Sequence, residues 1–144
     1  MGELLVVKFL KCLSCVQGEY IQLPRNTPSV DLICNKCGEQ AQVKTANSKS
    51  GSLPRYVLGG AWEPQRKLIS AGSLPRLFVV VIAHEDQAHI YSISSVDQKA
   101  EWFRIRKPLS EKAKSPGWTG FTIRLDEMGV LLENFGVFPI CNKG

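Results

Sequence analysis

The stretch DLICNKCGEQAQVK, residues 31–44, decides how this chain is organised. A C-x-x-C pair, Cys34 and Cys37, lies in its middle, between a short apolar segment and an alternating one. These two flanks, residues 31–33 and 40–45, have the pattern of short strands joined by a turn. We therefore predict a β-hairpin that carries two cysteines at its tip.

A second C-x-x-C pair lies upstream, and 18 residues separate the two pairs. Two such turns can present four thiolates at the corners of a tetrahedron, the geometry of a closed structural zinc site. The alternative is two disulfides in a secreted domain, but residues 4–7 are too short an apolar run for a signal peptide, and Lys8 interrupts it. Cysteine is also sparse for a disulfide scaffold. We therefore expect structural zinc, a reducing cytoplasmic location and, at Cys141, a plain thiol. The predicted zinc ligands are Cys12, Cys15, Cys34 and Cys37.

Length and composition indicate one ordinary globular domain. The 144 residues fit the size of a single domain, with 44% hydrophobic and 22% charged residues. No segment approaches the run of about 20 apolar residues that a membrane-spanning helix needs. We therefore expect one domain over residues 1–144, with the zinc motif embedded at 12–37 and no membrane partner.

Positive charge is concentrated in residues 99–124. The whole chain has a net charge of +5, and this stretch holds seven basic and two acidic residues. Such a stretch indicates a polyanion-binding surface, with DNA as the obvious partner; a merely solvated basic face is the alternative. The basic residues are Lys99, Arg104, Arg106, Lys107, Lys112, Lys114 and Arg124.

Hydrophobic patterns predict a mixed α/β or α+β domain around one sheet. Residues 77–83 form an unbroken apolar run rich in β-branched side chains, which predicts a strand buried on both faces. Residues 61–70 are the best candidate for a helix, with Pro64 in its first turn. Residues 3–11 suit a helix or a strand, and the tail shows no clear period. The remaining expectations are strands at 20–23, 88–94 and 121–125, a short helix near 97–101 followed by a strand, and loops at 46–60 and 108–120.

Three polar residues of the hairpin suggest a catalytic site. Residues two apart in a strand share a face, so Gln42 and Lys44 point one way while Val43 points into the core. Asp31 can face them across the hairpin. Hydrolysis of a phosphodiester uses a divalent metal held by oxygen ligands and a cation that stabilises the developing charge. By spacing alone, this pattern favours an ordinary polar strand face over a magnesium site.

The segment from Asp31 to Lys44 resembles the catalytic core of the PD-(D/E)XK nuclease superfamily. More narrowly, it is similar to the DpnI-like restriction endonucleases, also called Dam-replacing proteins, in which the second C-x-x-C pair of a zinc site follows the metal-binding aspartate. The resemblance covers roughly residues 12–125. Further similar segments, in the same order, are Gly60-Ala61-Trp62, residues 77–82, Arg106-Lys107-Pro108-Leu109 and residues 117–123.

The resemblance implies a PD-(D/E)XK fold, namely a mixed central sheet with an inserted four-cysteine zinc hairpin. It also implies cleavage of duplex DNA at GATC sites that carry N6-methyladenine. Asp31 matches the metal-binding aspartate and Lys44 the motif lysine, so Asp31, Gln42 and Lys44 are the expected catalytic residues, with magnesium on Asp31 and Gln42.

Residues 106–120 correspond to the region of that family that reads the DNA sequence. Trp118 either stacks on bases or packs in the core, whereas Trp102 and Phe103 are expected to pack. The expected DNA contacts are Arg104, Arg106, Lys107, Lys112, Lys114 and Trp118.

Two departures from the family pattern leave three functions open. Gln42 stands where the motif has glutamate, and an amide oxygen coordinates magnesium without adding charge. The C-terminal winged-helix domain that family members usually carry is expected to be absent, and whether a partner subunit supplies it is left open by the sequence. The leading hypothesis is a metal-dependent type II endonuclease. The alternatives are a methylated-DNA-binding module with a decayed PD-QXK site and a zinc-ribbon scaffold for protein partners, against which the basic stretch argues.

Overall fold

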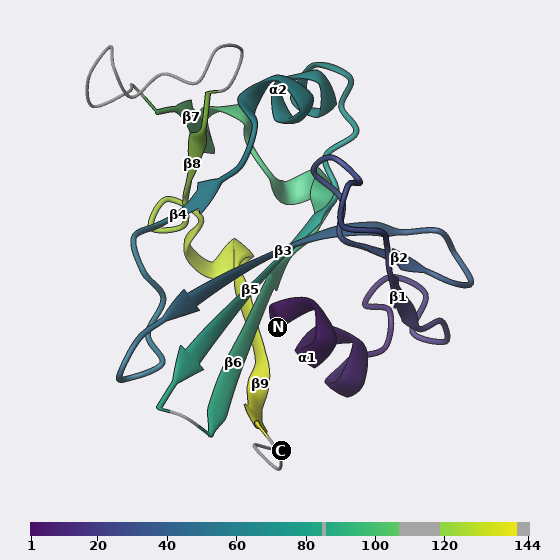
Figure 1. Ribbon diagram of the computed structural model, residues 1–144, viewed down its shortest axis with the longest axis vertical. Helices are drawn as coiled ribbons and strands as arrows, with labels where there is room; N and C mark the ends of the chain where they lie inside the picture. The colour runs from purple at the N-terminus through teal and green to yellow at the C-terminus, as the bar shows by residue number, and fades with distance from the viewer. Residues whose placement is uncertain (85, 107–118, 141–144) are drawn as a thin grey trace.

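The computed structural model describes residues 1–84, 86–106 and 119–140, which form two β-sheets and two α-helices (Figure 1). The larger sheet has six strands in the order β1-β2-β3-β5-β6-β9. β3 pairs with β5 in parallel, whereas the other described neighbours are antiparallel, so the sheet is mixed as predicted. Its strands are Tyr20–Gln22 (β1), Leu32–Cys34 (β2), Gln40–Asn47 (β3), Arg76–Ala83 (β5), Gln87–Ile93 (β6) and Glu133–Pro139 (β9).

The smaller sheet is antiparallel, has the order β4-β8-β7 and lies with helix α2 at one end of the molecule (Figure 1). None of the described helices is long and apolar enough to cross a lipid bilayer. The strands are Tyr56–Gly59 (β4), Phe103–Ile105 (β7) and Phe121–Arg124 (β8). The helices are Gly2–Phe9 (α1) and Trp62–Ser70 (α2), with 3₁₀ turns at Ser95–Asp97, Ala100–Trp102 and Gly129–Leu131.

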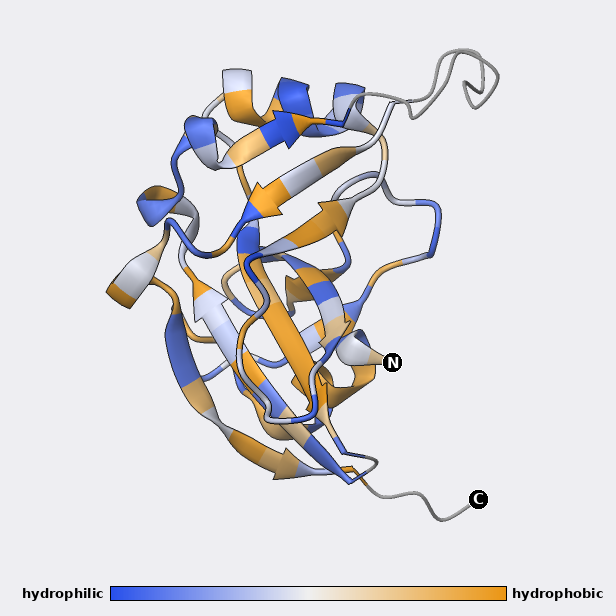
Figure 2. Ribbon diagram, turned by 90° about the vertical axis from the view of Figure 1, so that its left-hand side faces the viewer, coloured by the Kyte–Doolittle hydropathy of each residue, from blue (hydrophilic) through white to orange (hydrophobic). Residues whose placement is uncertain are grey.

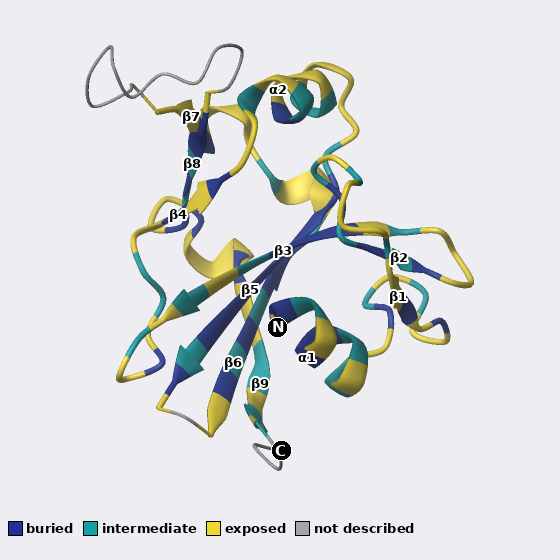
Figure 3. Ribbon diagram, in the orientation of Figure 1, coloured by how far each residue is buried: buried dark blue, intermediate teal, exposed yellow. Residues whose placement is uncertain are grey.

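Strand β5 lies at the centre of the fold and is almost entirely buried, as its sequence predicted (Figure 3). Alternate side chains point to opposite faces of the sheet. Phe78 and Val80 join helix α1 in one hydrophobic cluster, whereas Leu77 and Val79 pack with the three-stranded sheet in a second. Hydrophobic residues accordingly concentrate on the strands and hydrophilic ones on the outer loops (Figure 2).

Strand β3 uses its two faces differently. Val43 belongs to the cluster formed with α1, as predicted. Gln42 and Lys44 lie on the opposite face and line a cavity whose far wall comes from the start of α2 and from β8. The fold therefore places these two polar side chains between the two sheets.

Two regions differ from the sequence-based expectation. Residues 46–60 were predicted to be a loop, but β3 extends to Asn47 and β4 spans Tyr56–Gly59. This strand is short, and it ends in glycine, a residue that is depleted in strands. The tail forms β9, which pairs with β6 across a register shift between Ile90 and Tyr91. Such a bulge interrupts the period-two pattern from which a strand is recognised.

Two adjacent glycines give a matched test of the packing between β4 and β8. A Cβ on Gly59 would overlap the ring of Phe121, which is 1% exposed, whereas a Cβ on Gly60 would meet nothing within 4 Å. We expect Gly59→Ala to lower the free energy of unfolding by about 1–3 kcal/mol, the usual effect of overpacking. Gly60→Ala should change it by less than about 0.5 kcal/mol. Denaturant unfolding followed by circular dichroism measures both, and equal effects would contradict the packing described.

Candidate functional site

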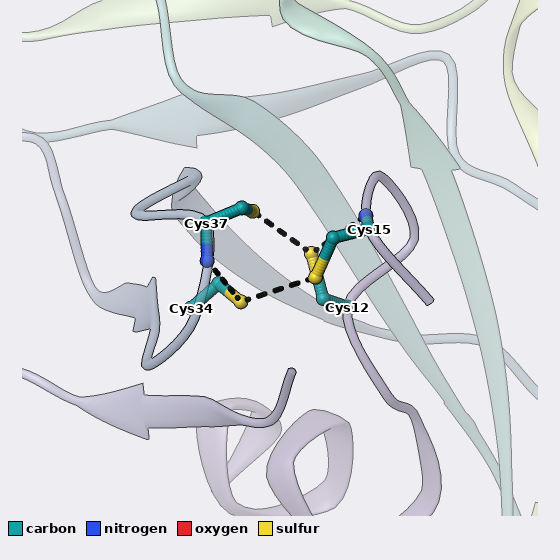
Figure 4. A group of neighbouring side chains, drawn as sticks. All are labelled: Cys12, Cys15, Cys34 and Cys37. Atoms are coloured by element: carbon teal, nitrogen blue, oxygen red, sulfur yellow. Dashed lines mark hydrogen bonds between the residues drawn. The ribbon is translucent and has the colours of Figure 1, made fainter. Parts of the chain in front are cut away.

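Four cysteine sulfurs meet where the loop after α1 approaches the β2–β3 turn (Figure 4). All four sulfurs lie within 4.8 Å of one another, with 3.5 Å between the Sγ atoms of Cys12 and Cys37 and 3.7 Å between those of Cys15 and Cys34. A tetrahedral zinc ion with Zn–S bonds of about 2.3 Å holds its sulfurs about 3.8 Å apart. The cluster is therefore a candidate metal site whose donors and spacing are consistent with structural zinc.

Backbone N–H groups around the cluster favour the thiolate form that zinc requires. The N–H groups of Lys36 and Cys37 each lie 3.4 Å from Cys34 Sγ. Although burial alone would raise it, these donors and the neighbouring Cys12 and Cys37 thiols lower the pKa of the Cys34 thiol to about 6. Burial and the neighbouring thiols, in contrast, raise the pKa of Cys37. The Gly18 N–H lies 3.2 Å from Cys15 Sγ and lowers the pKa of that thiol as well.

Glu39 connects the cysteine cluster to the central sheet. Its carboxylate accepts hydrogen bonds from Ser14, within the first C-x-x-C pair, and from the Tyr20 hydroxyl on β1 at 2.7 Å. The Arg76 guanidinium on β5 forms a salt bridge with it at 2.8 Å and also donates to Ser92 on β6. Burial alone would raise the pKa of Glu39, but these donors lower it. Glu39 therefore supports the fold around the hairpin.

Asp31, Gln42 and Lys44, the three polar residues that the sequence singled out, line one cavity. Asp31 immediately precedes β2, whereas Gln42 and Lys44 lie two residues apart on β3. Among the described residues that line the cavity, Asp31 is the one carboxylate, and Glu39 does not line it. The rest of the wall comes from Pro28, Ser29, Gly60, Ala61, Pro64 and Phe121.

The backbone of β3 holds Asp31 in place. Its Oδ2 accepts the N–H of Val43 at 2.7 Å, and its own N–H donates to the carbonyl of Ala41 at 2.9 Å. Burial raises the pKa of Asp31, while the Val43 N–H and the charge of Lys44 offset part of this effect. None of the described residues donates a hydrogen bond to Oδ1, which leaves that oxygen for a ligand.

Two acidic side chains from different parts of the fold affect the pKa of Lys44. Burial lowers the pKa of Lys44, whereas the negative charges of Asp31 and Glu3 raise it. Glu3 lies in the first turn of α1, where the neighbouring Gly2 packs closely against the Thr45 side chain of β3. Sequence reasoning missed Glu3, because a tertiary contact between α1 and β3 brings it near the hairpin and no motif spacing signals that contact.

Gln42 is buried and donates from Nε2 to Oε1 of Gln65 at 3.3 Å. Gln65 lies on α2 and is completely buried. Sequence reasoning also missed Gln65, although a signal was present: it lies three residues after Trp62 and four before Ile69, on the apolar face of the predicted helix. A polar residue on a buried helix face needs a partner, and here the partner is Gln42.

The structure describes two of the six expected DNA-contacting residues. Arg104 lies on β7 and forms a salt bridge with Glu127 at 2.8 Å, whereas Arg106 follows β7 and is exposed. Trp102 and Phe103 are buried, which confirms that they pack. The others lie outside the described residues: Lys107, Lys112, Lys114 and Trp118.

Fold and site together define a mixed α+β protein with a candidate four-cysteine metal site and a separate cavity lined by an acid, an amide and a lysine. A family model described as DpnI, the Dam-replacing family, matches residues 1–135. The chain therefore belongs to the Dam-replacing family. This membership supports a restriction-type nuclease that depends on methylation, with DNA as its substrate.

The charges around Lys44 make its pKa a probe of the cavity. Because Asp31 favours the charged ammonium, Asp31→Asn should lower the pKa of Lys44 further below the ordinary value of 10.5, and Glu3→Gln should lower it less. The matched control is Asp97→Asn, at an exposed position, which should leave the pKa unchanged. NMR titration of the ¹³Cε resonance of Lys44 in the metal-free protein measures each value. A pKa that does not respond to Asp31→Asn would contradict the placement of the two side chains.

Proposed function

We propose that this protein is a magnesium-dependent endonuclease with a PD-(D/E)XK-type active site that cleaves duplex DNA containing N6-methyladenine in GATC-like sites. The observation that carries the proposal is the meeting of Asp31, Gln42 and Lys44 at one cavity in a chain of the Dam-replacing family. A carboxylate, an amide oxygen and an ammonium group are the set of groups that metal-assisted hydrolysis of a phosphodiester uses.

Asp31 and Gln42 would hold the magnesium ion. Asp31 offers Oδ1, and Gln42 offers Oε1, because its Nε2 is engaged with Gln65. Magnesium is usually held by one or two carboxylates together with waters and substrate phosphates, so this set fits, and DNA would replace some of the waters. When bound, magnesium polarises the scissile phosphate and lowers the pKa of a coordinated water. Since Gln42 carries no charge, we expect weaker metal binding than a glutamate would give.

Lys44 would stabilise the scissile phosphate or orient the attacking water. Only the charged ammonium can do this, and Asp31 and Glu3 both favour the charged form. The side chain is partly withdrawn from solvent, so its attraction for a phosphate is screened less than at an open surface. The two acidic neighbours therefore maintain the charge that the reaction needs.

Backbone hydrogen bonds place part of the basic stretch beside the cavity. The N–H of Arg106 donates to the carbonyl of Gly120 at 2.9 Å, next to Phe121 in the cavity wall. The N–H of Trp62, the first residue of α2, donates to the carbonyl of Thr119 at 2.7 Å. Basic side chains that flank the cavity would neutralise DNA phosphates close to Asp31 and position the duplex for cleavage.

One observation favours a second function, a methylated-DNA-binding module without nuclease activity. Asp31 is the one carboxylate among the described residues that line the cavity, and a single carboxylate gives a weaker magnesium site than two do. In this case the duplex would be bound through the same basic stretch and would remain uncut.

A cleavage assay separates these functions. The zinc-loaded protein is incubated with methylated and unmethylated GATC plasmid in the presence of magnesium or manganese. We expect cutting that requires both the metal and the methyl group. Methyl-dependent binding of an uncut plasmid would support the binding module instead. Absence of any binding would contradict both functions and favour a protein-binding scaffold.

Two lysine variants test the assignment within that assay. Lys44→Ala should lower the cutting rate by at least about 100-fold, the usual effect of removing a group that stabilises transition-state charge. It should leave the zinc content, measured by elemental analysis, unchanged. Lys49→Ala removes an exposed lysine that does not line the cavity and should cut at the wild-type rate. If Lys44→Ala also cuts at that rate, the active-site assignment is wrong.

A further inference from the structure

Gln65 is a polar residue at a fully buried position, which is unfavourable for the stability of the fold. Its side chain is 0% exposed, and its Nε2 has no hydrogen-bond partner among the described residues. A buried donor without a partner destabilises a protein relative to an apolar side chain of similar size, and such groups in native structures often have a functional reason. The one hydrogen bond that the described structure gives Gln65 leads to Gln42.

That hydrogen bond determines which end of the Gln42 amide faces the cavity. A glutamine side chain ends in an acceptor oxygen and a donor nitrogen, and only the oxygen can bind a cation. Gln42 Nε2 donates to Gln65 Oε1 at 3.3 Å, away from the cavity that Gln42 lines. No described residue donates to Gln42 Oε1. The oxygen end is therefore the one available to a ligand.

We propose that Gln65 is a positioning residue for the catalytic metal: its carbonyl oxygen fixes the Gln42 amide so that Oε1 faces Asp31 across the cavity. This inference rests on the function proposed above. Without the acceptor at position 65, the Gln42 side chain would be more stable with its NH₂ group turned towards the cavity, where water can accept its hydrogen bonds. A metal ligand would then be replaced by a donor that repels cations.

The two glutamines act as a pair under this proposal. A glutamate at position 42 has two equivalent oxygens and needs no such orientation. Because Gln65 turns its Oε1 towards position 42, its amide would have to rotate by about 180° before Nε2 could donate to that glutamate. The importance of Gln65 should therefore depend on which residue occupies position 42, and a merely structural role for Gln65 would show no such dependence.

Manganese binding to the zinc-loaded full-length chain tests the pair without an activity assay. Free Mn²⁺ is measured by electron paramagnetic resonance for wild type, Gln65→Met, Gln42→Glu and the double variant, with Asp31→Asn to identify binding in the cavity. We expect Gln65→Met to weaken binding about fivefold, the equivalent of one neutral hydrogen bond. Gln42→Glu should tighten binding, and adding Gln65→Met to it should weaken binding by less than about twofold.

The outcomes separate the inference from the proposed function. If wild type shows no Mn²⁺ binding that Asp31→Asn removes, the proposed function fails, and the inference fails with it. If such binding exists and Gln65→Met leaves it unchanged or tighter, only the inference fails. Tighter binding would mean that Gln65 donates to Gln42 and turns the amide nitrogen to the cavity. If Gln65→Met weakens Mn²⁺ binding equally in the wild type and in the Gln42→Glu variant, Gln65 has only a structural role.

A measurement on the unmodified protein covers the case in which Gln65→Met does not fold. NMR of the side-chain amides should show the Gln42 NH₂ protons protected from exchange with water. On addition of Mg²⁺, the ¹³Cδ resonance of Gln42 should shift more than that of Gln65. Rapid exchange of the Gln42 NH₂ protons, or a Gln42 ¹³Cδ resonance that does not respond to Mg²⁺, would overturn the inference.

Discussion

The cross-link between the two C-x-x-C pairs is the constraint on which the rest of the site depends. It joins the loop after α1 to the tip of the β2–β3 hairpin, where Ser14 also donates to Glu39 and the backbone of Glu19 bonds to Asn35. Glu39 links the cysteine cluster to the sheet. Its carboxylate accepts a hydrogen bond from the Tyr20 hydroxyl and forms a salt bridge with Arg76. Removing one partner of such a partly buried pair leaves the other charge uncompensated. The tip of the hairpin is thereby fixed.

With the hairpin fixed, the arrangement of the cavity follows from backbone geometry. Asp31 is tied to the Val43 N–H, and the period of two along β3 places Gln42 and Lys44 on the side opposite Val43. The candidate zinc site and the cavity are therefore separate: thiolates would hold the structural metal, and oxygen atoms would hold the catalytic one. At position 42 an uncharged amide would serve as an oxygen ligand, and the hydrogen bond to Gln65 would orient it.

Sequence patterns predicted those features that depend on neighbours along the chain. The cysteine cluster, the hairpin and the buried strand β5 were predicted because each depends on residues close together in the sequence. The structure also brings Asp31, Gln42 and Lys44 to one cavity, as alternation along a strand requires. Strand β9 was missed because a bulge breaks its pattern. Glu3 and Gln65 were missed because contacts between distant elements bring them to the site. The predicted DNA contacts at Lys107, Lys112, Lys114 and Trp118 lie outside the described residues.

In the proposed function, a structural metal and a catalytic metal bind at two different sites. X-ray diffraction near the absorption edges of zinc and manganese tests this most directly. A crystal of the zinc-loaded protein soaked in Mn²⁺ should give a zinc anomalous peak among the four cysteine sulfurs. It should give a manganese peak in the cavity, within coordination distance of Asp31 Oδ1 and Gln42 Oε1. Zinc in the cavity, or manganese at the cysteines with none beside Asp31, would contradict the account.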